Sequence, residues 1–225
     1  MASTASSFRI LVSAVAAAAL LAPGAGRASL SDAQKAAPAS ELIVLAAPAS
    51  FAKAIEEVEK ATGVKGEKLP FGDVPLTEGR SFSLDNTLAE RLLEGSHAVF
   101  HKAGFFLFRY ERSFGMAGEK DRLGLMKTGD HRAVVRKVGT GSGHKGLGSE
   151  TVVTWLDALA KDEPFELYEV GTDYVAGRFE KTPKDPVAVA KRCADFAPDL
   201  VAGRASTLDL LAAEIKANRT LYLIW

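Results

Sequence analysis

Apolar residues recur along this chain at spacings that predict both helices and strands. The run LIVLAA, residues 42–47, predicts a strand that ends at Pro48. Ser50 is placed to cap a following helix, and Gly63 is suited to its carboxyl-terminal turn. The i, i+3, i+4, i+7 spacing predicts one buried face on this helix, formed by Phe51, Ala54, Ile55 and Val58.

The middle of the chain predicts a short strand, a helix and then a pair of strands. Residues 81–86 form the short strand. Thr87 and Glu90 have the spacing of a capping box and predict a helix that Gly95 ends. The aromatic-rich segment AVFHKAGFFLFRYE, residues 98–111, predicts two strands that turn around residues 102–104.

The carboxyl-terminal half alternates strands and helices in an order typical of ferredoxin-like folds. Its predicted elements are a strand (133–138), a helix (150–160), a hairpin of two strands (165–170 and 174–181), two helices (185–196 and 208–218) and a strand (220–225). Ser206 and Asp209 have capping-box spacing at the start of the last helix. A split β-α-β half of this kind, packed with a smaller amino-terminal α/β lobe, predicts the α+β class.

The amino-terminal residues 1–28 have the layout of a secretory signal peptide. Arg9 precedes an apolar run of about 13 residues, which is short of the roughly 20 that span a bilayer. Residues 29–40 are small and polar and predict a flexible tether. An amino-terminal lobe at 41–118 and a carboxyl-terminal domain at 119–225 are expected to follow. We therefore expect an exported protein, periplasmic or extracellular, with no membrane span after cleavage.

The composition argues against several classes of protein. The 28 basic and 28 acidic side chains cancel, and 47% of the residues are hydrophobic. This balance is typical of a folded domain and does not suit a polyanion, so no nucleic-acid partner is expected. The single cysteine, Cys193, cannot form a disulfide within the chain and is expected to be buried and inert.

A glycine-rich stretch, residues 139–150, matches the phosphate-binding pattern G-x-G-x-x-G through Gly141, Gly143 and Gly146. A dinucleotide site needs a parallel strand after the next helix, whereas the predicted strands fold back as a hairpin. The P-loop pattern also fails, because His144 stands where its second glycine belongs. We interpret the stretch as a connection between a strand and a helix.

Two histidines, His97 and His101, have the i, i+4 spacing that places metal ligands on one face of a helix. The predicted strand at this position would instead separate them by about 13 Å. No G-x-S-x-G, H-E-x-x-H or C-x-x-C motif occurs in the sequence. The sequence therefore predicts neither a metal site nor a cofactor.

The end of the chain resembles a known family. The segment FAPDLVAGRASTLDLLAAEIKANRTLYLIW, residues 196–225, is similar to a bacterial family of domains of unknown function 4253. The likeness includes the hairpin around Asp173 and the LMKTGD segment, and extends faintly back to about Gly63. Several residues of the family pattern are replaced here. A cysteine, an Asp-Gln pair, a hairpin carboxylate and a hairpin tryptophan fall at Ala197, Ala202, Gly203, Ala176 and Tyr174.

The polar matches that remain are candidate ligand or partner contacts. Together with the terminal aromatic residue they are Lys127, Asp130, Thr140, Asp173, Asp199, Thr207 and Trp225. Because a thiol and two carboxylates of the family pattern are missing, the resemblance implies a non-catalytic binding or interaction module. Its partner would be a protein or a small molecule. The alternative is a hydrolase-type enzyme that uses Asp199, Asp173 and Lys127 for acid–base chemistry.

Overall fold

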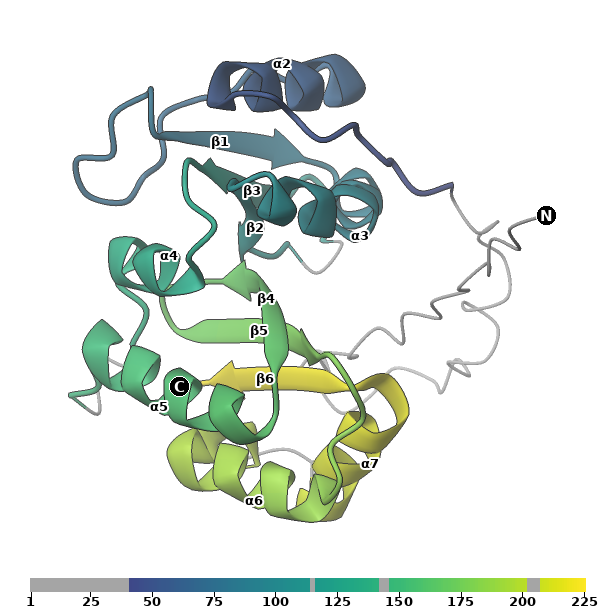
Figure 1. Cartoon of the computed structure of the whole chain (residues 1–225), viewed down its shortest axis with the longest axis vertical. Coiled ribbons are helices and arrows are strands. Elements are labelled where there is room, and N and C mark those ends of the chain that lie inside the picture. The colour runs from purple at the N-terminus through teal and green to yellow at the C-terminus, as the bar shows by residue number, and fades with distance from the viewer. Residues whose placement is uncertain (1–40, 114–115, 142–145, 202–206) are drawn as a thin grey trace. The chain divides into compact units, whose positions relative to one another are not determined.

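The computed structural model describes residues 41–113, 116–141, 146–201 and 207–225 (Figure 1). The predicted signal peptide and tether lie outside this part of the chain, as do Gly143, His144 and Ser206. The described residues all belong to one compact unit. The fold described below belongs to that unit.

The centre of the unit is a six-stranded mixed sheet with the strand order β1-β3-β2-β4-β5-β6. Its strands are β1 (Gly79–Leu84), β2 (Phe106–Glu111), β3 (Asp121–Met126), β4 (Phe165–Val170), β5 (Tyr174–Phe179) and β6 (Thr220–Ile224). Neighbouring strands are antiparallel except β2 and β4, which are parallel. The α+β class predicted from the sequence is confirmed.

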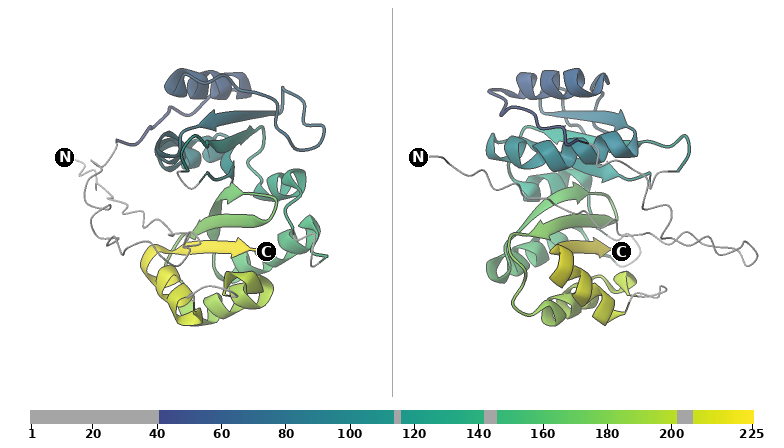
Figure 2. Two further views of the ribbon diagram at one scale, coloured as in Figure 1. Left: turned by 180° about the vertical axis from the view of Figure 1, so that it is seen from behind. Right: turned by 90° about the vertical axis from the view of Figure 1, so that its right-hand side faces the viewer.

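Helices cover the sheet from both sides and enclose two hydrophobic clusters. The helices are α2 (Phe51–Thr62), α3 (Asn86–Lys102), α4 (His131–Val138), α5 (Ser149–Asp162), α6 (Pro186–Phe196) and α7 (Leu208–Asn218), with a short 3-10 helix η1 (Pro198–Leu200). Helices α2 and α3 lie against β1, β3 and β2, and helices α4 to α7 lie mainly against β4, β5 and β6 (Figure 2). None of the helices in the described ranges is both long and apolar enough to cross a bilayer.

Helix α2 forms as predicted because both of its ends are capped. The Ser50 side chain accepts a hydrogen bond from the Lys53 backbone N–H at 3.2 Å. Gly63 adopts the left-handed conformation, with φ 71°, and its N–H donates to the Glu59 carbonyl. The predicted apolar face is confirmed, with Phe51, Ala54 and Val58 buried.

The predicted strand at 42–47 is wrong, because this segment lies extended against α3 and not in the sheet. Ser96 joins the two: its hydroxyl donates to the Ile43 carbonyl at 2.7 Å and accepts from the Leu45 N–H at 3.0 Å. The close approach occurs at Gly95, where a Cβ atom would lie 2.2 Å from the Ile43 carbonyl oxygen. Gly95 thus accommodates a crossing segment and does not end the helix as expected.

Helix α3 is longer than the sequence pattern predicts. It begins at Asn86 after Asp85 and continues to Lys102, so the first strand of the expected pair at 98–111 is helical. The helix continues because its buried positions keep a helical period; they are Ala89, Leu92, Leu93, Ser96, His97 and Phe100. The second predicted strand is confirmed as β2.

Residues 133–138, predicted as a strand, lie in α4, although their valines favour a strand. The Asp130 side chain caps this helix by accepting from the Arg132 N–H at 3.0 Å, and Gly139 ends it with φ 75°. The buried stripe that stabilises it consists of Val134, Val135 and Val138. The glycine-rich stretch consequently connects two helices. Because the described chain has no strand here, the ferredoxin-like half is not confirmed.

The predicted hairpin, the last two helices and the terminal strand are confirmed. β4 and β5 form an antiparallel hairpin, α6 starts with Pro186, and β6 pairs with β5. Helix α7 is capped by Thr207, whose side chain accepts from the Leu210 N–H at 3.3 Å. β3, which follows the predicted domain boundary at residue 118, lies between β1 and β2 in the sheet. The division into two domains stays a prediction.

Candidate metal centre

Three of the candidate contacts from the sequence lie between β3 and α5. Lys127 is exposed directly after β3, and Asp130 is the cap of α4. Thr140 is fully buried, and its hydroxyl donates to the Gly171 carbonyl at 2.7 Å. Thr140 therefore attaches the end of α4 to the β4–β5 hairpin, which is a structural task.

The other four candidates lie in connections and at the chain end. The Asp173 carbonyl, in the β4–β5 hairpin, accepts from the Trp225 N–H at 3.0 Å. The Trp225 ring lies edge-on to Phe196, with ring centroids 5.8 Å apart. Asp199 is exposed in η1, and Thr207 caps α7. Hydrogen bonds thus connect the β4–β5 hairpin, which contains Asp173, to Trp225 and to Thr140.

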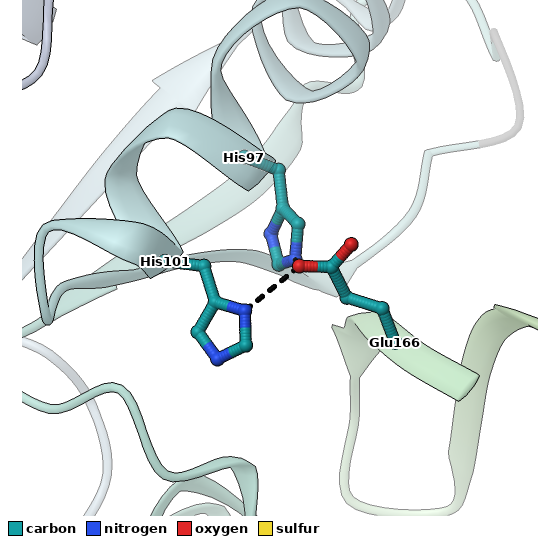
Figure 3. Close-up of side chains that lie close together, drawn as sticks. All are labelled: His97, His101 and Glu166. Atoms are coloured by element: carbon teal, nitrogen blue, oxygen red, sulfur yellow. Dashed lines mark hydrogen bonds and ion pairs between the residues drawn. The ribbon is translucent and has the colours of Figure 1, made fainter. Parts of the chain in front are cut away.

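A different group of side chains converges beneath the carboxyl-terminal end of α3 (Figure 3). His97 and His101 occupy successive turns of the helix, with ring centroids 5.9 Å apart. Glu166 reaches them from β4: its Oε1 lies 3.4 Å from His97 Nε2 and 2.8 Å from His101 Nδ1. The three possible ligand atoms all lie within 4.8 Å of one another.

Backbone carbonyls hold both imidazoles in place. His97 Nδ1 lies 2.5 Å from the Leu107 carbonyl oxygen, and His101 Nε2 lies 2.8 Å from the Gly129 carbonyl oxygen. A carbonyl only accepts hydrogen bonds, so each of these nitrogens carries a proton and donates. In a neutral imidazole the other nitrogen then presents a lone pair, and both of these nitrogens face Glu166. Histidine ligands of metals in proteins are oriented in this way.

The Glu166 carboxyl is ionised over the whole physiological pH range. Its pKa is lowered from 4.5 to about 2, first by the imidazole of His97 and then by that of His101, while burial opposes the change. In the metal-free protein His101 Nδ1 hydrogen-bonds to Glu166 Oε1 at 2.8 Å, and the proton in that bond occupies the place that a bound cation would take. His97 Nε2 is buried and has no hydrogen-bond partner among the described residues.

One side of the His97, His101 and Glu166 cluster is covered by Phe106, and another side is open to solvent. The Phe106 ring lies edge-on to both imidazoles, at 5.3 Å from His97 and 5.6 Å from His101. The His97 side chain is 7% exposed, whereas those of His101 and Glu166 are 32% and 39% exposed. A cation held here would have three protein ligands and a side that solvent or another ligand can reach.

The sequence indicates the two histidines of this cluster but not the glutamate. The i, i+4 spacing of His97 and His101 is visible, but the predicted strand separated the two imidazoles, and the expectation of no metal site followed from it. The expectation of no metal site therefore depended on a predicted strand that is in fact part of helix α3. Glu166 lies 65 positions after His101, and nothing local marks it as a partner.

A second charged cluster connects β2, β3 and β4. Arg109 is buried, with Nε 3.2 Å from Asp121 Oδ2 and Nη1 3.6 Å from Glu169 Oε1. Asp121 also accepts from the Ser113 N–H at 2.8 Å, and Arg112 contacts Glu169. Because carboxylates and guanidinium groups pair within this cluster, its charges are compensated internally and hold strands together.

Comparison with known proteins gives one match. Residues 122–225 match the family model described as "Domain of unknown function (DUF4253)". Glu166 lies within the matched part, and His97 and His101 precede it. Neither the curated proteins nor the solved structures contain a match to this chain. The resemblance noted in the sequence is thereby confirmed: residues 122–225 of this chain match the model of the DUF4253 family.

Proposed function

We propose that this protein is a binding module for a divalent transition-metal ion, with His97, His101 and Glu166 as its protein ligands. The observation that supports the proposal is the convergence of two carbonyl-anchored imidazoles on one ionised carboxylate. A bound cation compensates the carboxylate and uses both nitrogen lone pairs at once.

The ligand types select among metals. Two imidazoles and a carboxylate are the set that binds Zn²⁺ and other first-row divalent ions, whereas Mg²⁺ and Ca²⁺ prefer oxygen ligands. Ligands at the usual distances from a tetrahedral Zn²⁺ lie about 3.3 Å from one another. The His97–Glu166 pair already has this separation, at 3.4 Å, and the His101–Glu166 pair, at 2.8 Å, has to open slightly.

Export remains part of the proposal. It follows from the signal-peptide layout of residues 1–28, and it places the module in the periplasm or outside the cell. The hydrolase alternative depends on Lys127, Asp173 and Asp199, which lie after β3, in the β4–β5 hairpin and in η1. The cluster of His97, His101 and Glu166 favours metal binding over the hydrolase alternative, because it needs no contribution from these three residues.

Titration calorimetry with Zn²⁺ on the purified, chelator-treated protein tests the proposal. We expect one ion per chain, and we expect His101→Ala to weaken binding by at least about 100-fold, because one of three protein ligands is lost. Glu166→Gln should weaken it similarly. Glu180→Gln is the matched control, since Glu180 is an exposed glutamate just after β5. Binding of Zn²⁺ by His101→Ala with wild-type affinity would refute the assignment.

A further inference from the structure

Arg178 on β5 is the cross-strand partner of Glu166, the proposed metal ligand on β4. The antiparallel register pairs Glu166 directly with Arg178. Directly paired residues project from the same face of a sheet, with Cβ atoms about 5 Å apart. The guanidinium group of Arg178 therefore leaves the sheet on the side where Glu166 meets the histidines of α3.

Electrostatic interactions place the Arg178 charge on this side of the sheet. Its charge interacts with Glu94 of α3 and with Tyr168 of β4. Glu94, His97 and His101 occupy positions i, i+3 and i+7 of the helix, which lie on one helical face. The Arg178 charge is thus on the side of the sheet where α3 presents Glu94, His97 and His101.

The guanidinium of Arg178 is available for a ligand. Within the described part of the chain its side chain makes no ion pair and no hydrogen bond. Buried Arg109, by contrast, is paired with Asp121 and Glu169. Arg178 is only partly buried, so an external group can reach it.

The proposed metal would make this region positive. A divalent ion bound by two neutral imidazoles and one carboxylate has a net charge of about +1 and keeps at least one coordination position open when three protein groups bind it. Arg178 adds a second positive charge and a planar donor group that suits oxyanions. Two cationic groups beside an open coordination position attract a negatively charged ligand.

We propose that the metal centre takes an oxyanion, the carboxylate or phosphate group of a small molecule, as an external ligand, and that Arg178 binds this group beside the metal. The inference rests on the proposed function, because the oxyanion needs the metal. It assigns the ligand class of the site.

Cobalt-substituted protein tests the inference, because the visible absorption of bound Co²⁺ responds to its ligands. We expect inorganic phosphate and, in a separate titration, acetate to change the spectrum saturably below about 10 mM, the range of weak specific binding. The anion with the tighter binding identifies which group the site prefers. Arg178→Gln should weaken its binding at least about tenfold and leave the affinity for Co²⁺ within about twofold.

Two controls separate the possible outcomes. Arg122→Gln removes a strand arginine on β3, outside the β4–β5 pair, and should leave anion binding unchanged. Unchanged Co²⁺ affinity in Arg178→Gln also shows that this variant is folded. Failure of Co²⁺ to bind the wild-type protein would overturn the metal site itself. Binding of Co²⁺ with no spectral response to either anion, or with equal responses in wild type and Arg178→Gln, would overturn the inference about Arg178 alone.

Discussion

Replacing Glu166 with glutamine should destabilise the metal-free protein in a way that depends on pH. The lowered pKa of Glu166, about 2 against an ordinary 4.5, corresponds to at most about 3 kcal/mol, since one pKa unit equals about 1.36 kcal/mol. The side chain is 39% exposed, and solvent screens its interactions with His97 and His101. We therefore expect Glu166→Gln to lower the free energy of unfolding by about 1–2 kcal/mol at pH 7.

The sign of the pH dependence follows from the direction of the pKa change. Because the folded-state pKa of Glu166 is lowered, its contribution is fully present above the unfolded-state value of 4.5. It is lost progressively as the pH falls from 4.5 toward about 2. The difference in unfolding free energy between wild type and Glu166→Gln should accordingly shrink from pH 6 to pH 3.

Urea unfolding of both proteins with a chelator present, at several pH values from 3 to 7, measures this difference. Comparison of the two proteins at each pH removes the contributions of groups that do not interact with Glu166. Glu180→Gln should differ from wild type by the same small amount at every pH, because Glu180 is exposed. A destabilisation by Glu166→Gln that stays constant down to pH 3 would falsify the electrostatic reasoning and leave only a packing effect.

Three further predictions concern the fold. Gly95→Ala should lower the free energy of unfolding by about 1–3 kcal/mol, because its Cβ would lie 2.2 Å from the Ile43 carbonyl oxygen; thermal unfolding measures this, and an unchanged melting temperature would contradict the crossing. Thr140→Val should cost about 1–3 kcal/mol in urea unfolding, because the buried Gly171 carbonyl loses its donor. Burial raises the pKa of the Cys193 thiol to about 12, so a thiol reagent at pH 8 should label the protein only after unfolding; rapid labelling of the native protein would show that the thiol is accessible.

Errors of prediction from sequence are concentrated where a local signal has a tertiary cause. Gly95 looks like the end of a helix, but its missing side chain makes room for the segment 41–47 that crosses α3. The valines of α4 favour a strand, yet Asp130 and Gly139 cap a helix whose valine face is buried. In both segments, burial against a neighbouring element outweighed intrinsic preference.

The sequence by itself determined the elements whose ends and faces are encoded locally. Caps and an apolar stripe define α2, and a tight turn defines the β4–β5 hairpin. The residues of the terminal segment 196–225, with the hairpin and the LMKTGD segment, carried the family resemblance. These signals depend on contacts between residues that are close in the chain, so they can be read without a structure.

The tertiary structure alone decided the candidate site. The i, i+4 spacing places His97 beside His101 only because α3 continues through Gly95, whose missing side chain leaves room for the Ile43 carbonyl. Glu166 joins them because β4 pairs in parallel with β2, next to α3. Strand pairing depends on the energy of the whole sheet and core, and no short-range pattern in the sequence specifies which distant carboxylate will face the two imidazoles.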